Sequence, residues 1–172
     1  MTLAVIGFGS NLGDGPQIVQ GAWARLSLEP KIVPRQLSAL YVTEAVGMVS
    51  SSLFTNAVGL VETELGPAEL LHLLLQVEIE YGRVRNTDEA GYQDRLLDLD
   101  LLYFGELVCQ LPDLILPHPQ IASRLFVLAP LAQLIPNFRD PVSGQTAEQM
   151  YQQLLASIEK GDLPAQHISR LA

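Results

Sequence analysis

The feature that most constrains the fold is an alternation of leucine and aspartate, Leu-Leu-Asp-Leu-Asp-Leu-Leu, at residues 96–102. A period of two fits a β-strand with one buried face, whereas a helix would need a period near 3.6. Such a strand points Asp98 and Asp100 to one face, with Cα atoms about 6.5 Å apart, and the leucines to the other. Two carboxylates beside apolar sequence repel each other and lose hydration, so their face needs a cation, an arginine or open solvent.

Apolar periodicity, bounded by glycine and proline, predicts the elements around this strand. We expect a strand at 3–9, a helix at 16–28 capped by Asp14 or Gly15, strands at 37–42 and 53–63, a helix at 67–81 and the acidic strand at 96–104. The order strand, helix, strand, strand, helix, strand predicts an α+β fold with a ferredoxin-like βαββαβ sheet.

The C-terminal part of the sequence adds further elements to this sheet. A short return strand ends near residue 112, and additional C-terminal helices are expected at 121–134 and 147–160. We expect residues 1–172 to form a single domain, in which residues 137–172 are a C-terminal helical extension.

The charge balance excludes several classes of partner. Ten Lys and Arg against 19 Asp and Glu give a net charge of −9, which disfavours binding to nucleic acid or to an anionic membrane surface. No apolar run approaches the roughly 20 residues that span a bilayer, and the N-terminus does not resemble a signal peptide. We therefore expect a cytoplasmic protein with small partners, no nucleic acid and no membrane.

Positive charge is scarce and concentrated. Between Arg35 and Arg124 the only basic residues are Arg83, Arg85 and Arg95, which lie close in sequence to the acidic pair. One interpretation is a Mg²⁺ site whose neighbouring arginines hold phosphate oxygens, the components that phosphoryl transfer needs. The other is a solvated face with ordinary salt bridges. The pattern alone leaves both open.

Other phosphate-binding signatures are missing from the sequence. Gly7, Gly9 and Gly13 do not have dinucleotide-binding spacing, and no Walker A motif occurs. His118 lies between two prolines, on what we expect to be a rigid, exposed turn. If ATP binds, it binds without a P-loop.

Several short motifs occur in one order along residues 3–136. They are Gly9-Ser10-Asn11-Leu12-Gly13, Tyr41-Val42-Thr43 with Gly47, Phe54-Thr55-Asn56-Ala57, Glu78 before Gly82-Arg83-Val84-Arg85, Arg95-Leu96-Leu97-Asp98-Leu99-Asp100, and Pro117-His118-Pro119 before Arg124 and Phe126. This ordered set resembles the 6-hydroxymethyl-7,8-dihydropterin pyrophosphokinase family of folate biosynthesis.

The resemblance implies an ATP-dependent diphosphotransferase of EC class 2.7.6. It would transfer the β,γ-diphosphate of ATP to the hydroxymethyl group of the dihydropterin and release AMP. The family has a ferredoxin-like fold and uses two Mg²⁺ ions, which by motif would be held by Asp98 and Asp100. The residues expected to contact phosphate oxygens are Arg83, Arg95, His118 and Arg124, and those expected on the nucleotide side are Glu78 and Leu101. The residues expected to be catalytic are Arg83, Arg95, Asp98 and Asp100.

The resemblance also implies a pterin site. Phe54 and Phe126 would sandwich the bicyclic ring, while Asn56 and the loop from Thr43 to Val46 would read its amide edge. The strand pattern supports part of this independently, because alternation in 53–63 already places Phe54 and Asn56 on one face. A ring can stack on a pterin, and a carboxamide matches its donor and acceptor edge.

Two alternatives stay open beside this interpretation. One is another Mg²⁺-dependent nucleotidyl or phosphoryl transferase on a ferredoxin-like fold, and the other is a non-catalytic ligand-binding module. We expect a monomer, with functional coupling to the next folate-pathway enzyme.

Overall fold

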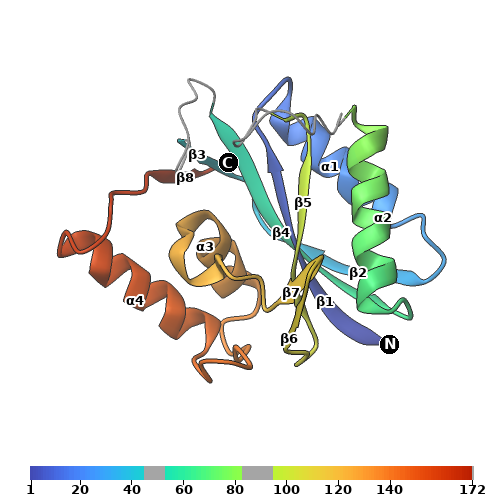
Figure 1. Cartoon of the computed structure of the whole chain (residues 1–172). Coiled ribbons are helices and arrows are strands. Elements are labelled where there is room, and N and C mark those ends of the chain that lie inside the picture. Colours follow the sequence, from blue (N-terminus) through green and yellow to red (C-terminus); the bar gives the residue numbers. More distant parts are fainter. Residues whose placement is uncertain (45–52, 83–94, 172) are drawn as a thin grey trace.

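A computed structural model describes residues 1–44, 53–82 and 95–171. Its centre is an antiparallel sheet of six strands, seen in Figure 1. The strands are β1 (Thr2–Ser10), β2 (Ile32–Leu37), β3 (Tyr41–Thr43), β4 (Phe54–Thr63), β5 (Asp98–Phe104) and β8 (Ile168–Arg170). Their order is β5-β1-β4-β3-β8, and β2 pairs with the other half of β4. The acidic strand β5 therefore lies at one edge, directly beside β1.

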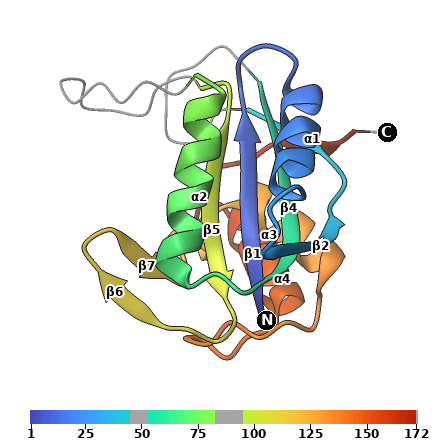
Figure 2. The ribbon, with the colours of Figure 1, turned by 90° about the vertical axis from the view of Figure 1, so that its right-hand side faces the viewer.

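Helices cover both faces of the sheet. Helices α1 (Gly15–Leu26) and α2 (Pro67–Glu80) lie on one face, and α3 (Leu125–Leu134) and α4 (Ala147–Glu159) lie on the other (Figures 1 and 2). The side chains of β1 divide accordingly: Ile6 packs into the hydrophobic cluster under α1 and α2, and Val5 into the cluster under α3 and α4. Strand alternation thus builds two cores from one sheet.

The leucines of β5 confirm the predicted alternation. Leu97, Leu99 and Leu101 are buried in the cluster under α1 and α2. Asp98 and Asp100 therefore face the α3 side of the sheet. The register against β1 shifts between Val5 and Ile6, so that Leu102 and Tyr103 both join the other cluster.

The first two helices begin as their sequences predict. The Asp14 carboxylate accepts a hydrogen bond from Gln17 N at 3.1 Å, which caps α1. At the start of α2, Glu69 accepts from Gly66 N at 2.7 Å. Helix α1 ends at Leu26, two residues earlier than expected.

The expected strand at 37–42 is wrong. Strand β2 ends at Leu37, and β3 begins only at Tyr41. Between them the Ser38 hydroxyl accepts a hydrogen bond from Val58 N at 3.0 Å, so a side chain takes the place of a ladder contact. Pro34 lies inside β2, where the register against β4 shifts.

The C-terminal half also differs in detail from the prediction. The return strand is a separate hairpin of β6 (Cys109–Leu111) and β7 (Leu114–Leu116). The helix expected at 121–134 is a 3₁₀ turn, Ile121–Ser123, followed by α3, because Arg124 between them has extended backbone angles. The extension after residue 136 contains strand β8 as well as α4.

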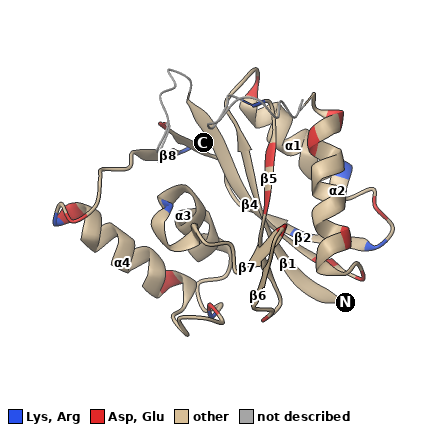
Figure 3. Ribbon diagram, viewed as in Figure 1, with Lys and Arg blue, Asp and Glu red and all other residues tan. Residues whose placement is uncertain are grey.

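Charged residues lie mostly on the outer helices and loops, but β5 carries acidic residues within the sheet (Figure 3). Among the described residues, no helix combines the length and apolarity needed to cross a membrane.

Candidate active site

Strands β5, β1 and β4, which are neighbours in the sheet, form the floor of a pocket of about 640 Å³ that faces α3. Gly9 of β1 pairs with Asp98 of β5 on one side and with Asn56 of β4 on the other, and Gly7 pairs with Asp100. A Cβ at Gly9 would lie 3.4 Å from Asn56 Oδ1, and a Cβ at Gly7 would lie 3.4 Å from Leu102 Cδ1. Glycines on β1 therefore keep open the space between the carboxylates and the amide. The first sequence motif begins at Gly9, but strand pairing was needed to reveal this use of Gly7 and Gly9.

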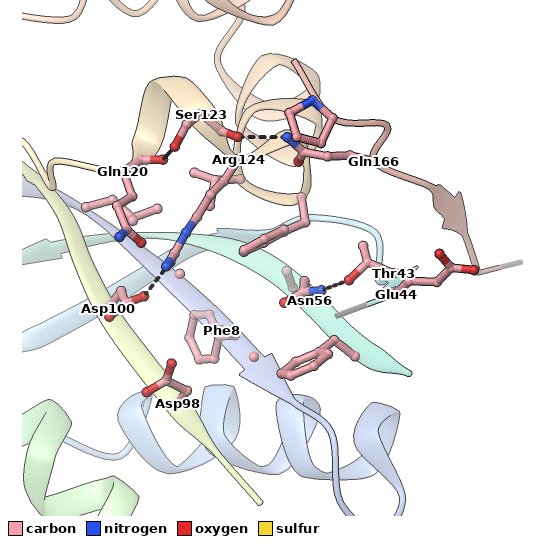
Figure 4. A pocket seen from close by; sticks show the side chains of 18 of the residues that line it. Phe8, Thr43, Glu44, Asn56, Asp98, Asp100, Gln120, Ser123, Arg124 and Gln166 are labelled. Atoms are coloured by element: carbon pink, nitrogen blue, oxygen red, sulfur yellow. Dashed lines mark hydrogen bonds and ion pairs between the residues drawn. The ribbon is translucent and has the colours of Figure 1, made fainter. Parts of the chain in front are cut away.

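The two carboxylates have different basic side chains as neighbours. Arg95 Nη1 donates to Asp98 Oδ1 at 2.7 Å. Arg124 Nη1 lies 3.8 Å from Asp100 Oδ2, and His118 Nε2 lies 4.0 Å from Asp100 Oδ1. The structure thus brings together charged residues from β5, its preceding segment and the segments before α3, as Figure 4 shows for Asp100 and Arg124.

Burial shifts the titration of two of these groups. Burial and then the charge of Asp98 raise the pKa of Asp100, against the opposing effect of His118, Arg124 and Arg95. Burial also lowers the pKa of His118, and Arg124 lowers it further, while Asp100 opposes this shift. The histidine is therefore largely neutral at pH 7, and the surroundings of Asp100 disfavour its negative charge.

His118 is half-buried, so the expectation that it lies on an exposed turn is wrong. Its backbone N–H donates to Leu102 O at 2.9 Å, and Gln120 N donates to its Nδ1 at 3.3 Å. The bond to Leu102 O joins the backbone at His118 to β5. The bond from Gln120 N occupies Nδ1, so the other ring nitrogen, Nε2, faces Asp100.

Glu78 is buried in α2 and contacts the backbone between the two acids. Its Oε1 accepts a hydrogen bond from Leu99 N at 2.7 Å. Because β5 is an edge strand, alternate N–H groups have no partner strand, and Glu78 supplies an acceptor for one of them. Glu78 therefore fixes the strand that presents Asp98 and Asp100.

Asn11 is a positioning residue that the sequence interpretation left without a role. Its side-chain Oδ1 accepts from Arg95 N at 2.7 Å, and its own backbone N–H donates to Arg95 O at 3.1 Å. This reciprocal pairing joins the loop after β1 to the entry of β5. An asparagine in a glycine-rich turn was the only signal for it in the sequence.

The predicted pterin-binding residues lie on the opposite side of the pocket from the acids. Asn56 and Thr43 are both buried, and Asn56 Nδ2 donates to Thr43 Oγ1 at 2.9 Å (Figure 4). Phe54 and Phe126 line the same pocket, and the Arg124 guanidinium carbon lies 5.5 Å from the Phe126 ring centroid. The amide is therefore held in one orientation beside two aromatic rings.

A second pocket of about 470 Å³ adjoins the first. It is lined by the residues predicted for the nucleotide side, namely Glu78, Arg95, Leu101 and His118. Asp98, Asp100 and Arg124 line both pockets. The two predicted ligand sites therefore meet at the carboxylates. Two predicted residues, Val46 and Arg83, lie outside the described residues.

The acidic pair has the composition of a site for a hard cation that also contacts substrate. The described residues contain no group of three or more His, Cys, Asp or Glu side chains arranged to hold a metal ion. Mg²⁺ is commonly bound through one or two carboxylates, with water and phosphate oxygens as its other ligands. Asp98 and Asp100, partly exposed at the junction of two pockets, fit that pattern.

Residues from the end of the chain also line the larger pocket. They are Leu163, Pro164, Ala165 and Gln166. The sequence motifs did not extend to them, and no local pattern indicated that this segment returns to the sheet.

Two adjoining pockets share the carboxylates of Asp98 and Asp100 and the guanidinium of Arg124, an arrangement typical of an enzyme active site. The family model for 7,8-dihydro-6-hydroxymethylpterin-pyrophosphokinase (HPPK) matches residues 5–136. The chain belongs to this family.

Two relatives and one solved structure illustrate the similarity. The 2-amino-4-hydroxy-6-hydroxymethyldihydropteridine pyrophosphokinase of Synechocystis sp. is 38% identical over 151 residues, which cover 88% of this chain and 75% of that one. The protein of the same name from Pseudomonas aeruginosa is 38% identical over 136 residues, covering 79% and 82%. The crystal structure of Plasmodium falciparum HPPK-DHPS with pteroate is 14% identical and has a TM-score of 0.73. That match covers 94% of this chain but only 44% of the longer HPPK-DHPS chain, and at this identity it shows the fold alone.

Proposed function

We propose that this chain transfers the β,γ-diphosphate of ATP to the hydroxymethyl group of 6-hydroxymethyl-7,8-dihydropterin. The products are AMP and the dihydropterin diphosphate, in the biosynthesis of folate. The observation that carries the proposal is the meeting of two pockets at Asp98 and Asp100, one lined by Phe54, Asn56 and Phe126 and the other by basic residues.

Residues of the smaller pocket would bind the triphosphate. Arg95, His118 and Arg124 come from different segments, so their donors can approach phosphate oxygens from several directions. Arg83 is proposed for the same role from the family motif. Glu78 and Leu101 would border the nucleotide, and Glu78 also holds β5 in place.

Asp98 and Asp100 would hold Mg²⁺, with two ions as the proposed number. When bound, the metal would neutralise phosphate charge and help orient the attacking hydroxyl. The raised pKa of Asp100 supports this role, because a carboxylate that is poorly compensated by its protein neighbours gains most from a cation.

The pterin would bind in the larger pocket. Phe54 and Phe126 offer ring surfaces, and Asn56, oriented by Thr43, offers a carboxamide to the edge of the pterin. Thr43 and Val46 would complete this edge from the loop that starts at β3.

The chemistry needs positioning more than a reactive side chain. The hydroxymethyl oxygen forms a bond to the β-phosphorus, the bond from that phosphorus to the α-phosphate oxygen breaks, and the hydroxyl proton is lost. The attacking group is a primary alcohol, so no covalent intermediate on the protein is required. Arg95 and Arg124 beside the carboxylates can stabilise charge on the transferring group.

The sheet order supports a ferredoxin-like fold. The path β5-β1-β4-β3, with α1 and α2 on one face, has the strand order of a βαββαβ unit. We further propose that residues 1–172 act as one domain and as a monomer. From the family resemblance we also propose functional coupling to the next folate-pathway enzyme. The cytoplasmic location stays a prediction from the sequence.

An assay with ATP, Mg²⁺ and the dihydropterin tests the function. Purified protein should release AMP in proportion to dihydropterin consumed. Release of ADP would favour a different phosphoryl transferase, and absence of turnover by folded protein would favour a binding module; either result would refute the proposed reaction.

A further inference from the structure

The segment that follows α4 returns to the site from the far end of the fold. Helix α4 ends at Glu159, and residues 163–166 then line the larger pocket beside Phe126 and Thr43. The family model ends at residue 136, so this contribution lies outside the region that the family match covers. The smaller pocket has no described lining residue from this segment.

Gln166 is fixed against the start of α3 by both ends of its amide. Its Nε2 donates to Ser123 O at 2.9 Å, as Figure 4 shows. Its Oε1 accepts a hydrogen bond from Leu125 N at 2.9 Å. These two backbone groups lie on either side of Arg124. The amide therefore clamps the backbone from which Arg124 reaches Asp100 and beyond which Phe126 enters the pocket.

Strand β8 anchors the same segment on its other side. It pairs with β3 in the register Thr43 to Ile168, and Leu171 N donates to Leu40 O at 2.8 Å. The pairing holds the segment next to Thr43, whose hydroxyl accepts from Asn56. Residues 163–170 thus connect the two sides of the larger pocket, one on β3 and the other on α3.

We infer that residues 163–170 complete the pterin side of the site, with Gln166 as a positioning residue for Arg124 and Phe126. The inference rests on the proposed function for the identity of the ligand. Because the segment lines only the larger of the two pockets, its loss should affect the dihydropterin more than the nucleotide.

The test compares three variants of the full chain. Gln166→Met keeps the length of the side chain but removes both hydrogen bonds, while Gln166→Glu keeps the acceptor for Leu125 N. Gln152→Ala is the matched control, because Gln152 is an exposed residue of α4 whose Nε2 donates to Glu148 Oε1 at 2.9 Å on the same helix. Calorimetric titration with the dihydropterin, in the presence of Mg²⁺ and a non-hydrolysable ATP analogue, measures affinity separately from turnover.

We expect Gln166→Met to weaken dihydropterin binding about tenfold, as two lost hydrogen bonds would allow. Its affinity for the ATP analogue should change less than about threefold, and Gln166→Glu should recover part of the loss. Thermal midpoints should stay within about 4 °C of wild type, since Gln166 is partly exposed. Wild-type dihydropterin affinity in Gln166→Met would overturn the positioning role, and an equal loss for both ligands would overturn the assignment of residues 163–170 to the dihydropterin side of the site.

Ala165→Trp tests the wall independently of the hydrogen bonds. Ala165 is exposed and lines the pocket, so a bulky ring there should obstruct the dihydropterin without unfolding the protein. Unchanged dihydropterin binding in this variant would show that the segment is not a wall of the site. If wild-type protein binds the dihydropterin but releases no AMP, the proposed reaction fails while the titrations still decide the role of the segment.

Discussion

Replacing Asp100 by asparagine should stabilise the metal-free protein and at the same time remove its activity. Asp98 and Asp100 lie on one face of β5, and as alternate residues of a strand they have Cα atoms about 6.5 Å apart. At that separation two unit charges repel by about 2.5 kcal/mol at an effective dielectric constant of about 20. The Asp100 side chain is 36% exposed, and Arg95 contacts Asp98, so screening and pairing reduce the net effect to about 1 kcal/mol.

The dependence on pH has a definite sign. Burial and Asp98 raise the pKa of Asp100 above its unfolded value, so the native state binds this proton more tightly than the unfolded state does. Stability contributed by this group therefore falls as pH rises from the ordinary pKa of aspartate through the raised one. Asparagine has no such titration, so the stability advantage of Asp100→Asn should grow across that window and be complete above it.

Thermal unfolding in EDTA, together with AMP release in Mg²⁺, measures both effects. The variant should unfold about 2–4 °C above wild type near pH 7 and should show negligible turnover. Asp162→Asn is the control, because it removes the same charge from an exposed loop after α4. A variant that unfolds below wild type in EDTA, or that turns over near the wild-type rate, would refute the assignment of Asp100 to a cation site.

Three further substitutions test other contacts. Thr43→Val removes the acceptor for Asn56 Nδ2 and should weaken dihydropterin binding about tenfold, whereas Thr43→Ser should bind nearly as wild type; equal affinities for both would contradict the orienting role. Glu78→Ala should lower the free energy of unfolding by about 1–3 kcal/mol in urea titrations, and Glu78→Gln by less, because only the latter keeps an acceptor for Leu99 N. Phe54→Ala should weaken binding of the dihydropterin by up to about tenfold while leaving nucleotide affinity unchanged, and unaltered dihydropterin affinity in titration would exclude its stacking role.

Local alternation made two strand faces predictable, the face of β5 that carries Asp98 and Asp100 and the face of β4 that carries Phe54 and Asn56. The period of two in β5 and β4 fixed which residues share a face, and the structure confirms that Asp98 lies with Asp100 and that Asn56 lines a pocket with Phe54. The boundary between β2 and β3 was not predictable in this way, because a hydrogen bond from Val58 to Ser38 depends on a strand 20 residues away.

The contacts that position the site were also beyond the sequence pattern. Asn11 reaches Arg95 across 84 residues, Glu78 reaches Leu99 across 21, and Gln166 reaches Leu125 across 41. None of these pairs has a characteristic spacing, since each depends on how separate elements pack.

The sequence by itself determined strands β1, β4 and β5, the faces of their side chains and the family to which the motifs point, because periodicity and short motifs are local properties of the chain. Tertiary structure alone decided that β1 presents glycines between the carboxylates and Asn56, that the two pockets meet at Asp98 and Asp100, and that the end of the chain returns beside α3. The physical reason is that strand order and helix packing set these distances, and both are properties of contacts between segments remote in sequence.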